Sequence, residues 1–210
     1  MPAAACMIQN PDLTYEINLW PHYLYIAGLD EAGRGALAGP VAVGAVILPN
    51  DPALLSSTLS GARDSKQMTP LERASLAPQI KAIALNWSVG FSTAEEIDSQ
   101  GIVRATRLAA MRALHQFTLT PQYLLTDFRL ELPHLDISQT SLVKGDALCL
   151  SIACASILAK TERDALMLKL DEHYPGYQLG KHKGYGTQTH RSAMKRLGLS
   201  EIHRTSFHFK

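Results

Sequence analysis

Two adjacent carboxylates followed by a glycine-rich turn form the part of this chain best suited to chemistry. Asp30 and Glu31 come at the end of an apolar stretch over residues 24–29, and Gly33 and Gly35 follow directly. An apolar stretch that ends in acids predicts a strand that carries hard oxygen ligands to one edge of a sheet, and such ligands suit Mg²⁺ or Mn²⁺. The glycines would let a backbone or a ligand approach closely.

Two further acids lie at the ends of predicted elements. Asp127 ends a short apolar run, and Asp146 comes just before a long apolar segment. Carboxylates brought to one sheet edge repel each other unless cations offset their charge. Two divalent ions about 4 Å apart would do so, and they would align an attacking water with the leaving oxygen of a phosphodiester. Taken singly, Asp30, Glu31 and Asp127 could be solvated turn acids, and Asp146 could be a helix cap.

The elements that must position these acids follow from the periodicity of apolar residues. A helix over residues 94–117 would be capped by Thr93, with Val103 and Thr106 on its core face. The order of strands and helices predicts a mixed α/β domain with helices packed on a central sheet. The other predicted elements are strands over 23–29, 41–48, 86–93, 123–128 and 141–144, and helices over 148–164 and 187–197.

Length and charge limit the domain organisation. A chain of 210 residues can form one well-buried domain, alone or with an appendage, and we expect residues 1–20 to be a loosely ordered extension. The net charge is only +1, but residues 181–210 hold seven Lys and Arg against Glu201. That segment is therefore +6 and the remainder −5. A basic tail after an acid-bearing core indicates a polyanion lying across both, although a solvated basic helix would look the same.

Several other patterns carry no function. The three cysteines, Cys6, Cys149 and Cys154, lack metal-type spacing and fit a reducing cytoplasm. We expect neither a signal peptide nor a membrane span. Ser156 and Lys160 are one residue too far apart for a Ser-x-x-Lys nucleophile motif. The C-terminal histidines lack zinc spacing, so we expect most of them at the surface or on phosphates.

A series of motifs, in order along residues 26–207, resembles ribonuclease HII, the type 2 ribonuclease H family. The motifs are Gly28-Leu-Asp30-Glu31-Ala-Gly33-Arg34-Gly35, Ala38-Gly39-Pro40, Asp64-Ser65-Lys66, Lys144-Gly145-Asp146, Ala155-Ser156-Ile-Leu-Ala159-Lys160, Arg163-Asp164, Tyr174-Pro175-Gly176-Tyr177, His182-Lys183-Gly184-Tyr185-Gly186-Thr187, His203-Arg204 and Ser206-Phe207.

The resemblance implies a ribonuclease H-like fold, with a five-stranded mixed sheet flanked by helices and a small helical C-terminal region. The domain would span residues 21–210, with a catalytic core to about residue 174 and the basic region over 175–210. The implied activity is Mg²⁺- or Mn²⁺-dependent cleavage of the RNA strand of RNA–DNA hybrids, and of single ribonucleotides embedded in duplex DNA. The products would carry 5′-phosphate and 3′-hydroxyl ends, and the enzyme would act in the cytoplasm as a monomer.

The resemblance also implies roles for individual residues. The four catalytic, metal-holding acids of the family map to Asp30, Glu31, Asp127 and Asp146. Contacts to the ribose 2′-hydroxyl, which separate RNA from DNA, map to Gly33, Arg34, Gly35 and Tyr185. Phosphate contacts are expected from Ser65, Lys66, Lys144, Lys183, Arg191 and Arg204.

One departure leaves an alternative open. Where the family has glycine after the third acid, this chain has Phe128. If that position needs a positive φ, Phe128 would alter the loop and weaken the Asp127 ligand. A nucleic-acid-binding module of the same fold with impaired catalysis is therefore the second hypothesis.

Overall fold

Five strands form one mixed sheet in the part of the chain that the computed structural model describes, residues 10–63, 65–128 and 130–207. Their order across the sheet is β3-β2-β1-β4-β5, and β1, which carries Asp30 and Glu31, is central. β1 runs antiparallel to β2 and parallel to β4. The strands are β1 Ile26–Ala32, β2 Val41–Ile47, β3 Asn86–Ser92, β4 Tyr123–Asp127 and β5 Ser138–Leu142.

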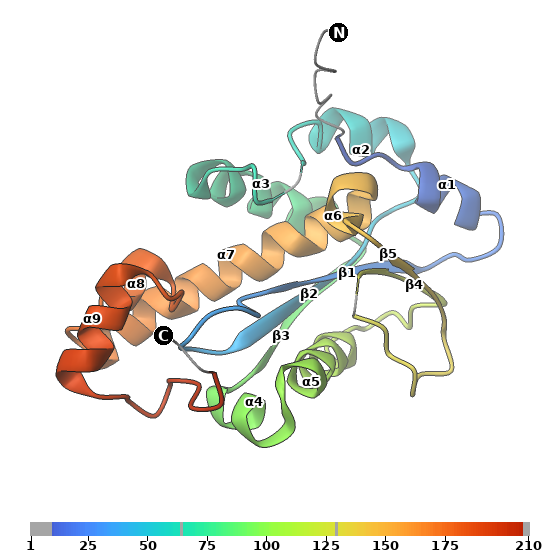
Figure 1. Cartoon of the computed structure of the whole chain (residues 1–210). Helices are drawn as coiled ribbons and strands as arrows, with labels where there is room; N and C mark the ends of the chain where they lie inside the picture. The colour runs from blue at the N-terminus through green and yellow to red at the C-terminus, as the bar shows by residue number, and fades with distance from the viewer. Residues whose placement is uncertain (1–9, 64, 129, 208–210) are drawn as a thin grey trace, which may run out of the picture.

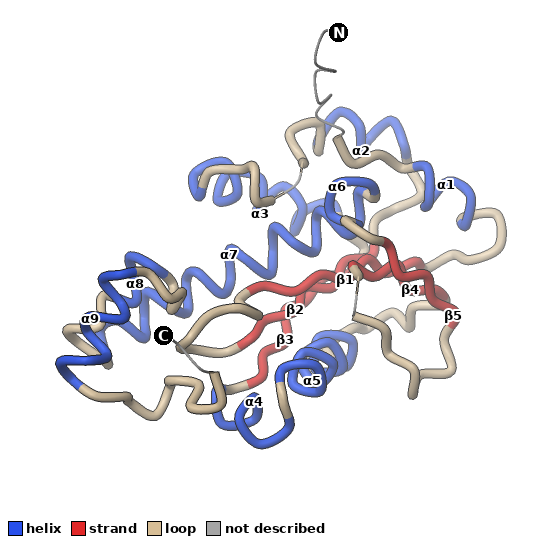
Figure 2. Tube along the Cα trace, viewed as in Figure 1, coloured by secondary structure: helices blue, strands red, loops and turns tan. Residues whose placement is uncertain are grey.

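Helices cover both faces of this sheet, as Figures 1 and 2 show. The longest helix, α7, crosses one face and packs on β1 and β2, whereas α5 packs on β2 and β3 from the other side. The predicted α/β domain with a five-stranded mixed sheet is therefore confirmed. The helices are α1 Thr14–Leu19, α2 Pro52–Thr58, α3 Pro70–Ile83, α4 Ala94–Gln100, α5 Ile102–His115, α6 Gly145–Leu148, α7 Leu150–His173, α8 Leu179–His182 and α9 Gln188–Leu197.

The close contact between α7 and the sheet depends on glycine in the strands. A Cβ on Gly28 would lie 2.3 Å from the Ser151 carbonyl carbon, and one on Gly44 would lie 2.2 Å from the Ala155 carbonyl oxygen. Both obstacles are backbone atoms and cannot move aside without moving the helix. Small side chains on the facing surface of α7 complete the contact, because a larger residue would hold the layers apart.

Four predicted element boundaries are wrong. The helix predicted over 148–164 is α7, which continues to His173. The first strand begins at Ile26 and includes both acids instead of ending before them. The predicted helix over 94–117 is two helices, because Gly101 adopts a φ of 80° that ends α4 and precedes α5. On α5, Val103 is 43% exposed, so its assignment to the core face is also wrong. The predicted strand at 141–144 lies earlier, at β5.

The N-terminal segment also differs from the expectation of loose order. Residues 14–19 form α1, and Leu13 and Glu16 are buried. Oε1 of Glu16 accepts hydrogen bonds from the Ser151 backbone N–H (2.8 Å) and from the Cys149 thiol (3.1 Å) at the start of α7. The first nine residues, which include Cys6, lie outside the described residues. Where the domain begins stays a prediction.

At the other end of the chain, α8 and α9 pack beside the C-terminal part of α7 (Figure 1). The predicted helix over 187–197 is confirmed as α9, with Thr187 as its N-cap and Gly198 at its C-terminus. Across the described residues, none of the helices combines the length and the apolar composition needed to span a bilayer.

Candidate metal centre

The sheet brings three of the four predicted acids together. β1 and β4 pair in parallel up to Leu29 and Thr126, so the next positions, Asp30 and Asp127, lie side by side at the same edge. One carboxylate oxygen each from Asp30, Glu31 and Asp127 lies within 4.8 Å of the others. Such a group of hard oxygen donors suits Mg²⁺ or Mn²⁺.

The electrostatics of this cluster show why a cation fits it. Asp30 is only 3% exposed, and burial raises its pKa to about 8, against the lowering effect of Lys160; Glu31 and Asp127 raise it further. Burial also raises the pKa of Glu31 and of Asp127. A buried oxygen of Glu31, Oε2, has no hydrogen-bond partner among the described residues. A bound divalent cation would satisfy that oxygen and stabilise the three groups as carboxylates.

Asp127 is held in place despite the bulky residue after it. Its Oδ1 accepts a hydrogen bond from the Gly145 backbone N–H at 2.7 Å. Within the described parts of the chain, the non-glycine residues with a positive φ are Lys144, Gln178 and Lys183, so Phe128 does not adopt one. In this structure Phe128 therefore does not require the strained backbone that would have displaced Asp127.

The fourth acid, Asp146, lies outside the group of three. It is buried in the short helix α6, and its Oδ2 pairs with the Lys66 ammonium at 2.9 Å. Its charge reaches the cluster, because it raises the pKa of Asp127. The helix-cap interpretation is wrong, since Cys149 holds the N-cap position of α7. A role for Asp146 with a second ion stays a prediction.

Sequence reasoning missed a buried polar network beside Asp30. Lys160 donates hydrogen bonds to the hydroxyls of Ser65 and Ser156, which also contact each other at 2.7 Å. Burial lowers the pKa of Lys160, while Asp30 raises it. Ser156 and Lys160 are one helical turn apart on α7, and that i, i+4 spacing was the available signal. Ser65 is thus a buried member of this network, whereas we expected it to contact phosphate.

The Gly33-Arg34-Gly35 turn lies over two buried arginines. Gly33 has a φ of 81°, and a Cβ there would lie 1.9 Å from Nε of Arg163. Arg163 in turn donates to the carbonyl of Pro40 at 2.8 Å. Arg204 is 2% exposed and donates to the carbonyls of Arg34 (2.9 Å) and Gly39 (3.0 Å). The expectation that Arg204 touches phosphate is contradicted by its burial, since its guanidinium is used to hold this turn.

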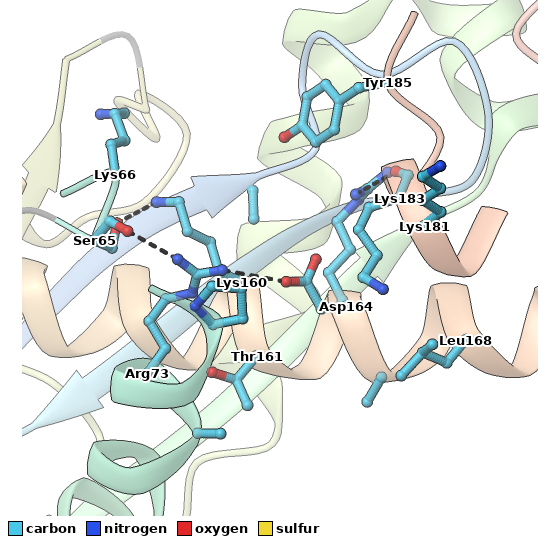
Figure 3. Close-up of a pocket in the computed structure, with 15 residues that line it drawn as sticks. Ser65, Lys66, Arg73, Lys160, Thr161, Asp164, Leu168, Lys181, Lys183 and Tyr185 are labelled. Atoms are coloured by element: carbon cyan, nitrogen blue, oxygen red, sulfur yellow. Dashed lines mark hydrogen bonds and ion pairs between the residues drawn. The ribbon is translucent and has the colours of Figure 1, made fainter. Parts of the chain in front are cut away.

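A cleft of about 540 Å³ extends from Lys66 and Lys160 to Tyr185, and Figure 3 shows its lining. The three acids of the metal centre are not among its lining residues, although Lys160 borders both sites. Tyr185 is 43% exposed, and its ring lies 5.5 Å from the Arg163 guanidinium. Among the described residues, the lining contains six cationic side chains and one acid, Asp164, so this part of the cleft favours an anion. The cations are Lys66, Arg73, Lys160, Arg163, Lys181 and Lys183.

Other predicted binding residues lie elsewhere. Lys144 and Arg191 do not line this cleft. Lys144 adopts a φ of 58° just before α6, and Arg191 donates to the Gly186 carbonyl at 3.0 Å. Three C-terminal histidines that we expected at the surface or on phosphates, His182, His190 and His203, are buried. Phosphate contacts from Lys66, Lys144, Lys183 and Arg191 stay predictions.

Comparisons with known proteins agree on one family. The family model described as Ribonuclease HII matches residues 27–210. The chain is 48% identical over 208 residues to a ribonuclease HII from Dehalococcoides mccartyi, covering 99% of this chain and 95% of that relative. It is 49% identical over 196 residues to one from Desulfitobacterium hafniense, covering 93% of this chain and 73% of the relative.

The fold has a solved counterpart. The crystal structure of the ribonuclease H2 from Pyrococcus horikoshii matches with a TM-score of 0.70 and 25% identity, covering 87% of this chain and 93% of that one.

Proposed function

Since the chain belongs to the ribonuclease HII family, whose members are metal-dependent endonucleases that act on RNA–DNA hybrids, we propose that it also cuts duplex DNA at single embedded ribonucleotides. The cut would leave 5′-phosphate and 3′-hydroxyl ends. The observation that carries the proposal is the group of three carboxylates, one buried and two partly buried, beside a cationic cleft that ends at an exposed tyrosine. One oxygen of Glu31 in this group has no hydrogen-bond partner among the described residues.

Asp30, Glu31 and Asp127 would hold Mg²⁺ or Mn²⁺ at this site. The bound metal supplies activation of water and stabilisation of the charge that develops on the phosphoryl oxygens. Asp127 is oriented by the Gly145 N–H, and Glu31 is oriented by Arg34, whose guanidinium lies 3.7 Å from its carboxylate. Asp146 and its partner Lys66 lie next to this group, where they would orient a water or a phosphate.

Recognition of the ribose would come from the other end of the cleft. The 2′-hydroxyl is both a donor and an acceptor, and it is the group that separates RNA from DNA. The phenol of Tyr185 and the backbone groups of Gly33, Arg34 and Gly35 can satisfy both roles. Because Gly33 has no side chain, its backbone can approach a sugar while Arg163 packs beneath it. Lys66 and Lys183 would contact the flanking phosphates.

A duplex DNA with one ribonucleotide is the test substrate. We expect a single cut with Mg²⁺ or Mn²⁺, none with EDTA, and none on the all-DNA duplex. Asp30→Asn should abolish cutting while the variant still binds an RNA–DNA hybrid. Undiminished turnover by this variant would contradict the metal role. Cutting of the all-DNA duplex at a similar rate would contradict ribonucleotide specificity.

The alternative of a binding module with impaired catalysis rested on Phe128, and Asp127 keeps its place in the cluster beside it. A monomeric state and a cytoplasmic location stay predictions.

A further inference from the structure

Three buried histidines form a cluster next to Tyr185, outside the metal centre. His182 lies on α8, His190 on α9, and His203 in the segment after α9. The rings of His182 and His190 stack with centroids 4.3 Å apart, and Nε2 of His190 lies 3.2 Å from Nε2 of His203. All three imidazoles are at most 8% exposed, whereas histidine side chains usually stay partly accessible to water.

The partners at the two ends of the His190–His203 pair fix the tautomer of each ring. Nδ1 of His190 lies 3.0 Å from the Tyr185 carbonyl oxygen. A carbonyl can only accept, so this Nδ1 carries hydrogen and Nε2 of a neutral His190 does not. At the other end, Nδ1 of His203 lies near three groups of Ser200: the backbone N–H (3.0 Å), the hydroxyl (2.8 Å) and the carbonyl oxygen (3.3 Å). The N–H can only donate and lies closer than the carbonyl, so we assign Nδ1 of His203 as the acceptor without hydrogen and Nε2 as the N–H.

The two assignments agree where the rings meet. With these tautomers His203 donates from Nε2 to Nε2 of His190, so the polarity is consistent where the two rings meet. The result is a directed chain from the Ser200 amide, through both rings, to the carbonyl of Tyr185. His182 is satisfied separately, with Nε2 on the Tyr177 carbonyl (2.8 Å) and Nδ1 accepting from the Gly184 N–H (3.2 Å).

This chain of hydrogen bonds keeps its polarity only while both imidazole rings are neutral. A proton added to His190 would place two N–H groups against each other at 3.2 Å, and one added to His203 would face the Ser200 N–H. Burial lowers the pKa of His190 to about 4, with a further lowering from His182, and burial also lowers the pKa of His203. The charged groups that interact with Tyr185, Arg163 and Arg204, are both cations.

We propose that His190 and His203 are positioning residues for Tyr185, holding its backbone through this hydrogen-bonded chain so that its phenol meets the ribose. The inference rests on the proposed role of Tyr185 in ribonucleotide recognition. Its mechanical part is independent of that role: the Tyr185 backbone is tied at its N–H to the His182 carbonyl (2.9 Å) and at its carbonyl to His190. The Tyr185 carbonyl also accepts from the Thr187 N–H (2.8 Å), so loss of the bond from His190 would leave this side of Tyr185 held by Thr187 alone.

Nitrogen NMR of the histidine side chains tests the chain itself in the wild-type protein. We expect His190 as the Nδ1–H tautomer and His203 as the Nε2–H tautomer, both neutral from pH 6 to pH 8. An ordinary histidine has a pKa near 6.5 and would titrate in that range. The opposite tautomer at either ring, or titration of either ring between pH 6 and 8, would overturn the proposal whatever the substrate is.

Kinetics test the link to Tyr185. His190→Phe keeps the ring but removes the donor, so we expect kcat/KM on the single-ribonucleotide duplex to fall about tenfold, the loss of one buried hydrogen bond. His190→Asn keeps a donor near the place of Nδ1 and should stay within about threefold of wild type on the same scale. Ser192→Ala, at an exposed and uncharged position of α9, is the matched control and should leave kcat/KM unchanged.

A double variant separates positioning from a general loss of structure. If His190 acts through Tyr185, adding His190→Phe to Tyr185→Ala should cost little beyond Tyr185→Ala alone, because the two residues are coupled. Mn²⁺ affinity measured by calorimetry should be the same in all these variants. Additive losses, equal losses for His190→Phe and His190→Asn, or weakened Mn²⁺ binding would each overturn the positioning role. If the wild-type protein fails to cut the duplex, the proposed function is contradicted. The NMR experiment would then be the test of the hydrogen bonds through His190 and His203.

Discussion

The Asp30 carboxyl is the most costly side chain of the site to keep charged. It is 3% exposed, lies within 4.8 Å of two other carboxylates, and is offset mainly by Lys160. Buried groups of this kind shift their pKa instead of paying the full cost of ionisation. Burial and the neighbouring carboxylates make the charged form of Asp30 unfavourable when no cation is bound. The same two features favour the binding of a cation, which would offset the negative charge.

The first prediction concerns the pH dependence of stability without metal. The pKa of Asp30 is about 8 in the folded protein, and an unfolded aspartate has a pKa of about 3.9. Between these values only the unfolded chain releases the proton, so the stability of the wild type should fall as pH rises from about 4 to about 8. In EDTA, Asp30→Asn should show a higher Tm than wild type at pH 8 and a smaller difference at pH 5.

Thermal melts of both proteins with and without Mn²⁺ supply the control. Wild type should gain Tm on adding Mn²⁺ and the variant should gain little, because ligand binding stabilises only the state that binds. A wild-type Tm in EDTA that rises with pH over this range would contradict the prediction.

A second residue-scale prediction separates Arg204 from Lys183. Arg204 is buried and donates to two backbone carbonyls, so Arg204→Gln should lower the free energy of unfolding by about 2–3 kcal/mol. It should leave the salt dependence of hybrid binding unchanged. Lys183→Gln should do the opposite, reducing the salt slope by about 1 with little effect on unfolding. Denaturant titrations and binding at several salt concentrations measure both. A reduced salt slope for Arg204→Gln would restore the phosphate contact that we expected for it.

At the scale of elements, α7 is positioned from its first turn by a residue of the N-terminal segment. Glu16 is 1% exposed, and its Oε1 accepts the Ser151 N–H, one of the amide groups that a helix leaves without partners at its start. The N-cap residue itself, Cys149, makes no side-chain cap bond to α7. Capping by a distant carboxylate also places negative charge at the positive end of the helix dipole.

Removing this cap should destabilise the whole domain. Glu16→Ala should lower the free energy of unfolding by about 1–2 kcal/mol, the usual effect of losing a helix cap. Glu16→Gln keeps an acceptor for Ser151 and should lose less. Urea denaturation of the three proteins gives the comparison. Equal losses for the two variants would show that the hydrogen bond from Ser151 is not the source of the stability.

The contact of α7 with β2 makes a sharper prediction. Gly44→Ala places a Cβ 2.2 Å from the Ala155 carbonyl oxygen, so the helix must move off the sheet. We expect a loss of more than about 3 kcal/mol, at the upper end for point substitutions, or no folded protein. Gly61→Ala is the matched control, because a Cβ there meets nothing within 4 Å. Circular dichroism melts measure both. A Gly44→Ala protein as stable as the control would contradict this packing.

The elements differ in how well the sequence predicts them. The strand at residues 86–92 and the helix at 188–197 have clear periodicity or caps, and both were predicted. The acids were found because their type and place at strand ends point to metal chemistry. The Glu16 cap and the contact of Lys160 with Ser65 were not found, because each joins residues far apart in sequence. The histidine chain was not found, because the spacing of the histidines does not show that their rings turn inward and meet. A single Gly101 also ended a helix that periodicity alone would continue.

At the scale of the whole molecule, the chain end is tied to the far side of the sheet. The carboxylate of Asp98 on α4 accepts hydrogen bonds from the backbone N–H and the hydroxyl of both Thr205 and Ser206. Partial burial raises the pKa of Asp98, but the bonds from Ser206 and Thr205 outweigh it and lower the pKa to about 2. The C-terminal segment that supplies His203 and Arg204 to the site is anchored by this carboxylate.

The last prediction is the acid response of this anchor. The pKa of Asp98 is about 2 when folded and about 3.9 when unfolded, so its contribution is present above pH 4 and is lost as pH falls toward 2. Asp98→Asn should be less stable than wild type at pH 6, and the difference should shrink at pH 3. Chemical denaturation at both pH values measures it. A difference that grows on acidification would contradict the lowered pKa.

One unbroken helix joins the chemistry to the recognition. Ser156 and Lys160 belong to the polar network beside Asp30. Arg163, further along α7, lies under the Gly33 turn and beside Tyr185. Arg163 comes seven positions after Ser156 on the helix, which is about 10 Å along the axis. An insertion or deletion of one residue between them would rotate everything after it by about 100°. Any related sequence that keeps both the metal centre and the recognition of ribose must therefore keep the length of this helical stretch. The surface loops can change length freely.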